Sequence, residues 1–300
     1  MSLQLSNVTK QFGDKEAVSQ LNLTIAPGEV MGLIGQNGAG KTTTFRMILD
    51  FIQPTQGKIL LNDRAIDDKA KQKIGFLPEE RGLYQKWTVE EQILYFAELH
   101  GMKRGDARIA LQDWLKKLEV VGAASDKVQK LSKGNAQKIQ LIATIIFQPE
   151  LLILDEPFSG LDPVNTAILM NEIDKLKQAG AMILFSSHNM DGVAKLSDNV
   201  TMLKHGQTVL QGNVQGIREQ FGRTQVYVET ALDDAELQAI DGVLSLEKQG
   251  SGRLLRLRDE AVGQTIFDKV SAGGYAQAFM QTPPTLDEIF RNEVADEHTN

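Results

Sequence analysis

The chain has 300 residues, 42% of them hydrophobic and 24% charged, which is the composition of an ordinary globular protein with one large domain or two smaller ones. Its 32 basic and 39 acidic side chains give a net charge of -7, which argues against a nucleic-acid binder held by phosphate contacts. The absence of cysteine excludes disulfides, thiol catalysis and cysteine-ligated zinc, and four scattered histidines argue against a multi-histidine metal site.

The sequence carries neither a recognisable secretion signal nor a membrane span. Residues 1–6 lack the basic stretch and long apolar core of a signal peptide, so we expect a cytoplasmic protein. The most apolar region, Ile139–Leu154, is interrupted by polar and charged residues and falls short of the roughly 20 apolar residues that a crossing helix needs. If the protein works at a membrane, we expect another chain to cross it.

The first elements predict a strand–loop–helix unit. Alternating residues in Leu3–Val8 and Leu21–Ile25 indicate strands, and Val30–Ile34 is a short apolar run typical of a buried parallel strand. A helix with one apolar face starts near Lys41. Between strand and helix lies Gly35–Thr42, which matches G-x-x-x-x-G-K-[ST]. This placement indicates a phosphate-binding loop, in which Lys41 reaches the terminal phosphates and the Thr42 hydroxyl faces magnesium.

A mainly helical insertion follows. Thr88–Met102 opens with a capping box, and the apolar residues of Asp106–Val121 recur at helical spacing. We expect a third helix over Asn135–Phe147. The Leu131–Asn135 segment ahead of it contains Ser132, which could cap that helix or present the helix N-terminus to an anion.

The sheet resumes with a buried strand, Leu151–Leu154, that ends in Asp155 and Glu156. Ligands collect beyond the carboxyl ends of parallel strands, so Asp155 can bind Mg²⁺ while Glu156 addresses a water aimed at the γ-phosphate. A helix over Pro163–Gln178, capped by Asp162, and a strand over Met182–Phe185 complete this region.

Shorter elements follow after about residue 222. The patterns predict the order βαββαβ, which is the split motif of ferredoxin-like modules. Its strands are expected at Val226–Glu229, Val243–Gln249, Leu254–Arg258 and Ala276–Gln281, and its helices at Asp233–Ile240 and Ala261–Ala272. Arg253, Arg256 and Arg258 occupy near-alternate positions, which we interpret as a solvated sheet face rather than a phosphate site.

Leu-Ser-x-Gly in Leu131–Gly134, lying between the phosphate loop and the acidic pair, resembles the signature motif of the ATP-binding cassette ATPases. Ser159–Asp162 resembles the D-loop of that family, and His188, after the next strand, resembles its switch histidine. Phe12 falls where the family places an aromatic ring against adenine. The resemblance covers residues 2–220 strongly and the remainder weakly.

The chain departs from the family pattern at one position. Glu79, in Gly75–Glu79, stands where the family usually has glutamine. A carboxylate can still ligate magnesium but cannot donate a hydrogen bond as an amide does, so its effect on coupling stays open. The run Pro78–Tyr84 resembles a subset of bacterial export ATPases of the sodium and multidrug efflux type, and Pro283–Phe290 resembles the end of the small C-terminal domain of that group.

The resemblance implies an α/β P-loop NTPase cassette over residues 1–220, with a mixed core sheet and a helical subdomain at about residues 84–147, followed by a small α+β ferredoxin-like domain over residues 223–300. The resemblance also implies the roles of the site residues.

The expected ATP-binding residues are Phe12, Gly35, Gln36, Asn37, Gly38, Ala39, Gly40, Lys41, Thr42 and Thr43. Those expected to bind ATP across a dimer are Ser132, Lys133 and Gly134, with Asp162 carrying information between sites. The expected Mg²⁺ ligands are Thr42, Glu79 and Asp155, and the expected catalytic residues are Glu156 as general base and His188.

This resemblance implies that the chain is the ATPase subunit of an exporter, with ATP and Mg²⁺ as cofactors. One expected partner is a second cassette, most simply a second copy of this chain. The other is a separate membrane permease, which would hold the chain at the inner face of the cell membrane. No nucleic-acid partner is expected. The alternative is a non-transport cassette ATPase that remodels a ribosome or protein complex, against which the single cassette and the lack of long heptads count. A nucleotide sensor without turnover is opposed by Glu156 and His188.

Overall fold

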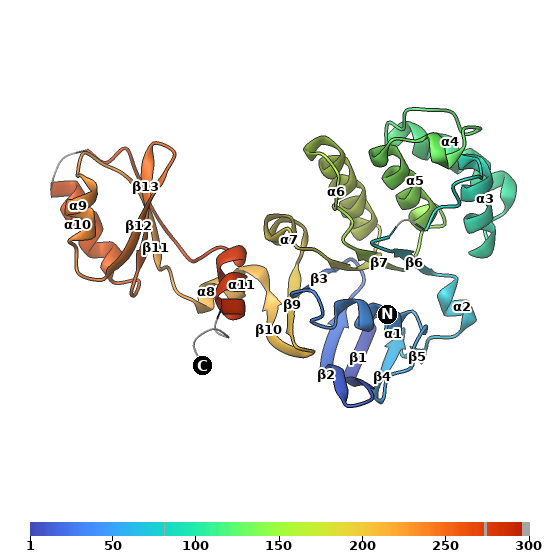
Figure 1. Cartoon of the computed structure of the whole chain (residues 1–300), viewed down its shortest axis with the longest axis horizontal. Helices are drawn as coiled ribbons and strands as arrows, with labels where there is room; N and C mark the ends of the chain where they lie inside the picture. The colour runs from blue at the N-terminus through green and yellow to red at the C-terminus, as the bar shows by residue number, and fades with distance from the viewer. Residues whose placement is uncertain (81, 273–274, 296–300) are drawn as a thin grey trace. The chain divides into compact units, whose positions relative to one another are not determined.

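The computed structural model describes residues 1–80, 82–272 and 275–295, so Arg81 of the Pro78–Tyr84 run and the last five residues of the expected C-terminal domain lie outside it. The chain forms two compact units that divide between Gln211 and Gly212 (Figure 1). We call them the first and second unit and describe each by itself.

Two sheets build the first unit. One has the strand order β2-β1-β4-β5, with antiparallel neighbours. Its strands are β1 (Leu3–Phe12), β2 (Lys15–Ile25), β4 (Gln56–Leu61) and β5 (Arg64–Ala65). The other has the order β10-β9-β3-β8-β7-β6, and its members from β9 to β6 run parallel. Its strands are β3 (Val30–Ile34), β6 (Ile74–Leu77), β7 (Leu151–Asp155), β8 (Met182–Ser186), β9 (Asn199–Lys204) and β10 (Gln207–Asn213).

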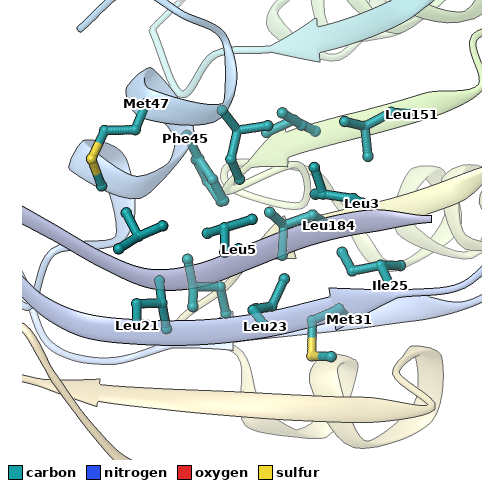
Figure 2. Close-up of a cluster of buried hydrophobic side chains, with 14 of the residues drawn as sticks. Leu3, Leu5, Leu21, Leu23, Ile25, Met31, Phe45, Met47, Leu151 and Leu184 are labelled. Carbon is teal, nitrogen blue, oxygen red and sulfur yellow. The ribbon is translucent and has the colours of Figure 1, made fainter. Parts of the chain in front are cut away.

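The core lies between these sheets and encloses α1 (Lys41–Ile48). Phe45 of α1 is fully buried among side chains of both sheets, including Leu5 of β1 and Leu184 of β8 (Figure 2). Burial of such a side chain contributes roughly 1.5–3 kcal/mol. This packing fixes α1 relative to β3, and therefore fixes the loop that joins them.

The helical insertion contains α3 (Val89–Leu99), α4 (Arg104–Lys117), a 3₁₀ turn (Val128–Lys130) and α5 (Lys133–Ile145), and its three α-helices pack on one another. The capping box of Thr88 and Glu91 is confirmed. The helix expected to reach Val121 ends at Lys117, because Glu119 takes a left-handed φ of 48° that no regular helix can continue. The helix expected from Asn135 begins two residues earlier, because the Ser132 side chain caps it.

Three further helices complete the first unit: α2 (Asp68–Lys71), α6 (Pro163–Gln178) and α7 (Met190–Leu196). The structure confirms α6 as predicted, with Asp162 as its N-cap and Pro163 in its first turn. Within the described residues we find no helix with the length and hydropathy that a bilayer crossing requires.

The second unit confirms the order βαββαβ. Its antiparallel sheet has the strand order β12-β13-β11-β14. The elements are α8 (Val214–Gln220), β11 (Gln225–Glu229), α9 (Asp234–Gln238), β12 (Val243–Gln249), β13 (Gly252–Leu257), α10 (Val262–Ala272), β14 (Ala278–Thr282) and α11 (Leu286–Ala295). It has its own core, around Val226, Leu255 and Ile266.

Two details of the second unit differ from expectation. The division falls before α8 rather than near residue 220, because α8 packs on α11 and Arg218 donates hydrogen bonds to the carbonyls of Pro283 and Pro284. Arg253 and Arg256 of β13 do not share one face, since alternation places Arg253 beside Asp234 of α9 and Arg256 beside Glu288 on the opposite face. Arg258 follows the end of β13 and pairs with Asp241 and Asp259.

Candidate functional site

The phosphate loop leaves β3 and enters α1, as the motif predicts. Gly35 has a φ of 152°, and a Cβ there would lie 2.4 Å from the carbonyl oxygen of Leu203. Gly40 has a φ of 112°, and a Cβ there would lie 2.6 Å from the carbonyl oxygen of Ala17. Both positions require glycine, because the backbone is left-handed and pressed against a neighbouring strand.

Lys41 is buried at the start of α1, and its Nζ donates hydrogen bonds to the carbonyls of Gly35 at 2.6 Å and Gln36 at 3.1 Å. Burial lowers the pKa of the Lys41 ammonium, while the nearby Glu156 and Asp155 carboxylates counter that effect. The side chain is thus held within its own loop, where it presents a cation to an anionic ligand.

Asp155 ends β7 and faces the phosphate loop. Its Oδ2 lies 3.5 Å from the Thr42 hydroxyl, and its Oδ1 accepts a 2.6 Å hydrogen bond from the hydroxyl of Ser186 on β8. The same Ser186 oxygen accepts a hydrogen bond from the backbone N–H of Glu156 at 3.1 Å. Ser186 is fully buried and thereby holds both acidic residues in place.

Glu156 follows with a left-handed φ of 50°, uncommon for a residue other than glycine, and the residue is only 9% exposed. Its Oε2 accepts a hydrogen bond from the His188 backbone N–H, and His188 Nε2 lies 3.3 Å from its Oε1. Burial raises the pKa of the Glu156 carboxyl, His188 and Lys41 oppose the rise, and Asp155 adds to it. A carboxylate held in this way suits a general base.

These groups share one cleft of about 300 Å³. The predicted residues that line it are Phe12, Asn37, Gly38, Gly40, Lys41, Thr42, Thr43, Glu79, Asp155, Glu156 and His188. Phe12 lines the cleft and is 50% exposed, and Nζ of Lys10 lies over its ring at 5.0 Å from the centroid, so stacking of this ring on a base stays a prediction. Three predicted residues of the loop do not line the cleft: Gly35, Gln36 and Ala39. The carbonyls of Gly35 and Gln36 instead accept the hydrogen bonds of Lys41.

The signature and D-loop residues lie outside this cleft. Ser132 Oγ accepts a hydrogen bond from the Asn135 N–H, and Asp162 Oδ1 accepts one from the Asn165 N–H, which lowers the pKa of Asp162. The two segments adjoin, because a Cβ at Gly160 would lie 3.5 Å from Nζ of Lys133, and one at Gly134 would lie 3.6 Å from the Asn165 side chain. The structure therefore places Ser132, Lys133, Gly134 and Asp162 together on a surface apart from the phosphate loop.

The oxygen donors fit a magnesium ion. Among the described residues, no three His, Cys, Asp or Glu side chains are grouped as a metal site, and the Thr42 hydroxyl and Asp155 carboxylate are the pair brought together. Mg²⁺ commonly takes one or two protein oxygens and completes its shell with phosphate and water oxygens. Glu79 lines the same cleft and is exposed, so its role as a ligand stays a prediction.

A second cavity, of about 360 Å³, lies where the helical insertion meets the core, and we call it the groove. It is lined mainly by apolar side chains: Leu49, Phe51, Ile74, Phe76, Pro78, Leu83, Phe96, Ala143 and Phe147, with Lys71, Gly82, His100, Gln140 and Thr144. Phe51, at its rim, is 66% exposed. The groove adjoins the Glu79 segment, because Pro78 belongs to its wall.

Sequence reasoning missed Ser186 and Lys15, which contribute to the site. The sequence does contain a signal for Ser186, because this residue lies two positions before His188. It ends a strand that runs parallel to the strand ending in Asp155. Lys15 lines the cleft from β2, and only the pairing of β1 with β2 brings it there. The groove could not be predicted, because its lining comes from four separate stretches of the chain, residues 49–51, 71–83, 96–100 and 140–147.

The sequence matches the family described as "ABC transporter" over residues 18–159, and that described as "ATP-binding protein DrrA1-3-like, C-terminal domain" over residues 212–294. The uncharacterized ABC transporter ATP-binding protein YhaQ of Bacillus subtilis is 43% identical, over 97% of this chain and 98% of that protein. The Nod factor export ATP-binding protein I of Sinorhizobium fredii is 30% identical, over 97% of this chain and 85% of that protein.

Solved structures agree with this assignment. An ATP-binding subunit of an ABC transporter superposes with a TM-score of 0.70 and 28% identity, covering 74% of this chain and 94% of that one. The cassette MJ0796, in a dimeric post-hydrolysis state bound to ADP and Pi, superposes with a TM-score of 0.63 and 25% identity, covering 70% of this chain and 98% of that one. The first unit thus has the fold of an ABC ATPase cassette, and the chain belongs to the ABC transporter ATP-binding proteins, as an ATPase subunit.

Proposed function

We propose that this chain is the ATP-hydrolysing subunit of an exporter, that two copies close around two ATP–Mg²⁺, and that the pair drives a separate membrane permease from the inner face of the cell membrane. The similarity to a Nod factor export protein over nearly the whole chain supports export. The match of the cassette to the family described as "ABC transporter" supports a transport role over the remodelling of a ribosome.

One observation carries the proposal: the phosphate loop, the Asp155–Glu156 pair and His188 line a single cleft. In that cleft Lys41 and the loop amides would bind the phosphates, and Glu156 would accept a proton from the attacking water. His188, beside Glu156, would orient the γ-phosphate and the water. Magnesium, when bound by Thr42 and Asp155, would neutralise charge on the phosphate oxygens.

The separation of the signature from the cleft supports a dimer. Ser132 and Lys133 belong to a surface that does not line the cleft of their own chain. If a second copy is placed head to tail, its signature segment can meet the ATP held by the first phosphate loop, and the interface is isologous. The dimeric state of MJ0796 bound to ADP and Pi supports a dimer here.

The groove supports a permease contact. It is apolar, opens at the exposed ring of Phe51, and adjoins the segment that carries Glu79. Exposed apolar patches of this kind mark protein interaction sites. A cytoplasmic segment of the permease seated there would lie beside the ATP site, which gives a route for passing motion between the subunits.

The proposal is tested by expressing the chain with its candidate membrane subunit and comparing Phe51→Asp with Ile109→Asp. Both side chains are largely exposed, at 66% and 69%, so neither change should unfold the chain, but only Phe51 borders the groove. We expect Phe51→Asp to abolish co-purification with the membrane subunit and Ile109→Asp to preserve it. Association with ribosomes rather than with a membrane protein would favour the remodelling alternative.

A further inference from the structure

Gln140 of α5 connects the groove to the segment that carries Glu79. Its side chain is 4% exposed and lines the groove. Its Nε2 donates a hydrogen bond to the carbonyl of Pro78 at 3.2 Å and approaches the carbonyl of Glu80 at 3.5 Å. The two residues on either side of Glu79 are therefore held by one side chain.

The orientation of this amide follows from its neighbours. Both backbone groups that it faces are carbonyls, which can only accept, so the NH₂ group must point toward them. The Oε1 atom is buried and has no hydrogen-bond partner among the described residues. A buried acceptor without a partner is unfavourable, so we expect a donor that reaches it from the groove to strengthen binding by about two- to tenfold, the effect of one hydrogen bond.

The lining of the groove defines the chemistry of its occupant. The ammonium of Lys71 is already paired with Asp50 at 2.7 Å and Asp68 at 3.4 Å. Burial lowers the pKa of His100, whose ring stacks on Phe147, so the imidazole is neutral near pH 7. The groove thus offers apolar contacts and one buried acceptor, which suits a segment with an apolar face and a single N–H or O–H donor.

We propose that Gln140 is a positioning residue that couples the groove to the ATP site: its Nε2 fixes Glu79 through the carbonyls of Pro78 and Glu80, and its Oε1 accepts a hydrogen bond from the permease segment seated in the groove. The second half rests on the function proposed above. Since the signature residue Ser132 caps the N-terminus of α5, the same helix links the groove to the proposed dimer surface.

The first half is tested on the isolated chain, using the Mg²⁺ concentration that gives half-maximal ATPase activity. Gln140→Met keeps the length of the side chain but removes the amide, and we expect it to raise that concentration about tenfold, within the range of couplings between contacting groups. In a Glu79→Gln background the same change should have less than a twofold effect. Equal effects in the two backgrounds would overturn the positioning role.

Thr144→Val is the matched control, because Thr144 lines the groove one turn further along α5 and its hydroxyl donates to the backbone carbonyls of Phe76 and Gln140 rather than to those of residues 78–80. We expect it to leave the Mg²⁺ requirement unchanged. Gln140→Asn is the second variant: it retains an amide, which a polar site tolerates, but is too short to reach Pro78. It should behave as Gln140→Met does, and thermal unfolding verifies that each variant is folded.

The second half is tested on the complex with the membrane subunit. We expect Gln140→Met to weaken the affinity of the chain for that subunit about two- to tenfold, the effect of one hydrogen bond, and Thr144→Val to leave it unchanged. An unchanged affinity for Gln140→Met would overturn the docking contact. If Phe51→Asp also retains the membrane subunit, the groove itself is wrongly assigned, which separates failure of the proposed function from failure of this inference.

Discussion

At the scale of single residues, Glu156 owes its character to its surroundings. It is buried, lies within 3.3 Å of the His188 ring and takes part of its position from Ser186, which accepts a hydrogen bond from its N–H. An ordinary glutamate is ionised above about pH 4.3. Because burial raises the pKa of Glu156, the carboxylate required of a base forms only at a higher pH than that.

This shift predicts the pH dependence of hydrolysis. Activity requires ionised Glu156, so kcat/KM should fall as the pH drops through the raised pKa of Glu156. His188 holds that pKa down, so His188→Ala should move the acid limb of the profile to higher pH, in addition to any loss of rate. A profile of kcat/KM between pH 5 and 8 for both proteins checks the sign. An acid limb that stays in place, or moves to lower pH, would contradict the assignment.

Ser186 should be needed for both stability and turnover. Ser186→Ala removes the donor to Asp155 Oδ1 and the acceptor for the Glu156 N–H within a fully buried site, so we expect a loss of about 1–3 kcal/mol in the free energy of unfolding. Urea denaturation measures the loss. Ser187→Ala is the control, since among the described residues Ser187 Oγ accepts a hydrogen bond from the Asn189 N–H and makes none with Asp155 or Glu156. Equal ATPase rates in the two variants would argue against the positioning role of Ser186.

At the scale of elements, the strand–loop–helix unit is held by close backbone approach. Gly35→Ala would force a Cβ to 2.4 Å from the Leu203 carbonyl, whereas Gly38→Ala meets no atom within 4 Å and carries only the strain of a left-handed φ of 83°. That strain costs roughly 1–2 kcal/mol. We expect Gly35→Ala to destabilise the nucleotide-free chain by clearly more than Gly38→Ala in urea denaturation. Equal losses would mean that the loop relaxes freely away from β9.

Elements with strong local signals could be predicted from the sequence. The proline and aspartate at the start of α6 and the capping box of α3 fixed those boundaries, and apolar runs identified β3, β7 and β8. The strand β4 was not predicted, because half of its residues are exposed and its pairing with β1 is long-range. The site was predicted where a motif is contiguous. The groups that support the site, Ser186 and Gln140, could not be predicted, because they act through contacts between distant segments of the chain.

At the scale of the whole molecule, the second unit has its own sheet and core and should fold by itself. A fragment starting at Gly212 is expected to show one cooperative thermal transition. Leu255→Ala, in the fully buried centre of that core, should cost about 2–5 kcal/mol in the fragment, while Leu244→Ala, at a site 66% exposed, should cost little. A fragment without a cooperative transition would show that the second unit depends on the cassette.

In the proposed dimer, two chains share ATP between a phosphate loop and a signature segment, and Glu156 ends the shared state by hydrolysis. Glu156→Gln retains the shape of the side chain but removes the base, so ATP should still bind while turnover falls by about 10²–10⁴-fold. Lys41→Ala, which removes the phosphate contact, serves as the control that does not bind ATP.

The most direct measurement is sedimentation of Glu156→Gln with and without Mg²⁺–ATP. We expect a shift from monomer to dimer on addition of ATP in Glu156→Gln and no shift in Lys41→Ala. A Glu156→Gln chain that stays monomeric with ATP bound, or that hydrolyses ATP at the rate of the unaltered protein, would rule out the proposed ATP-sharing dimer.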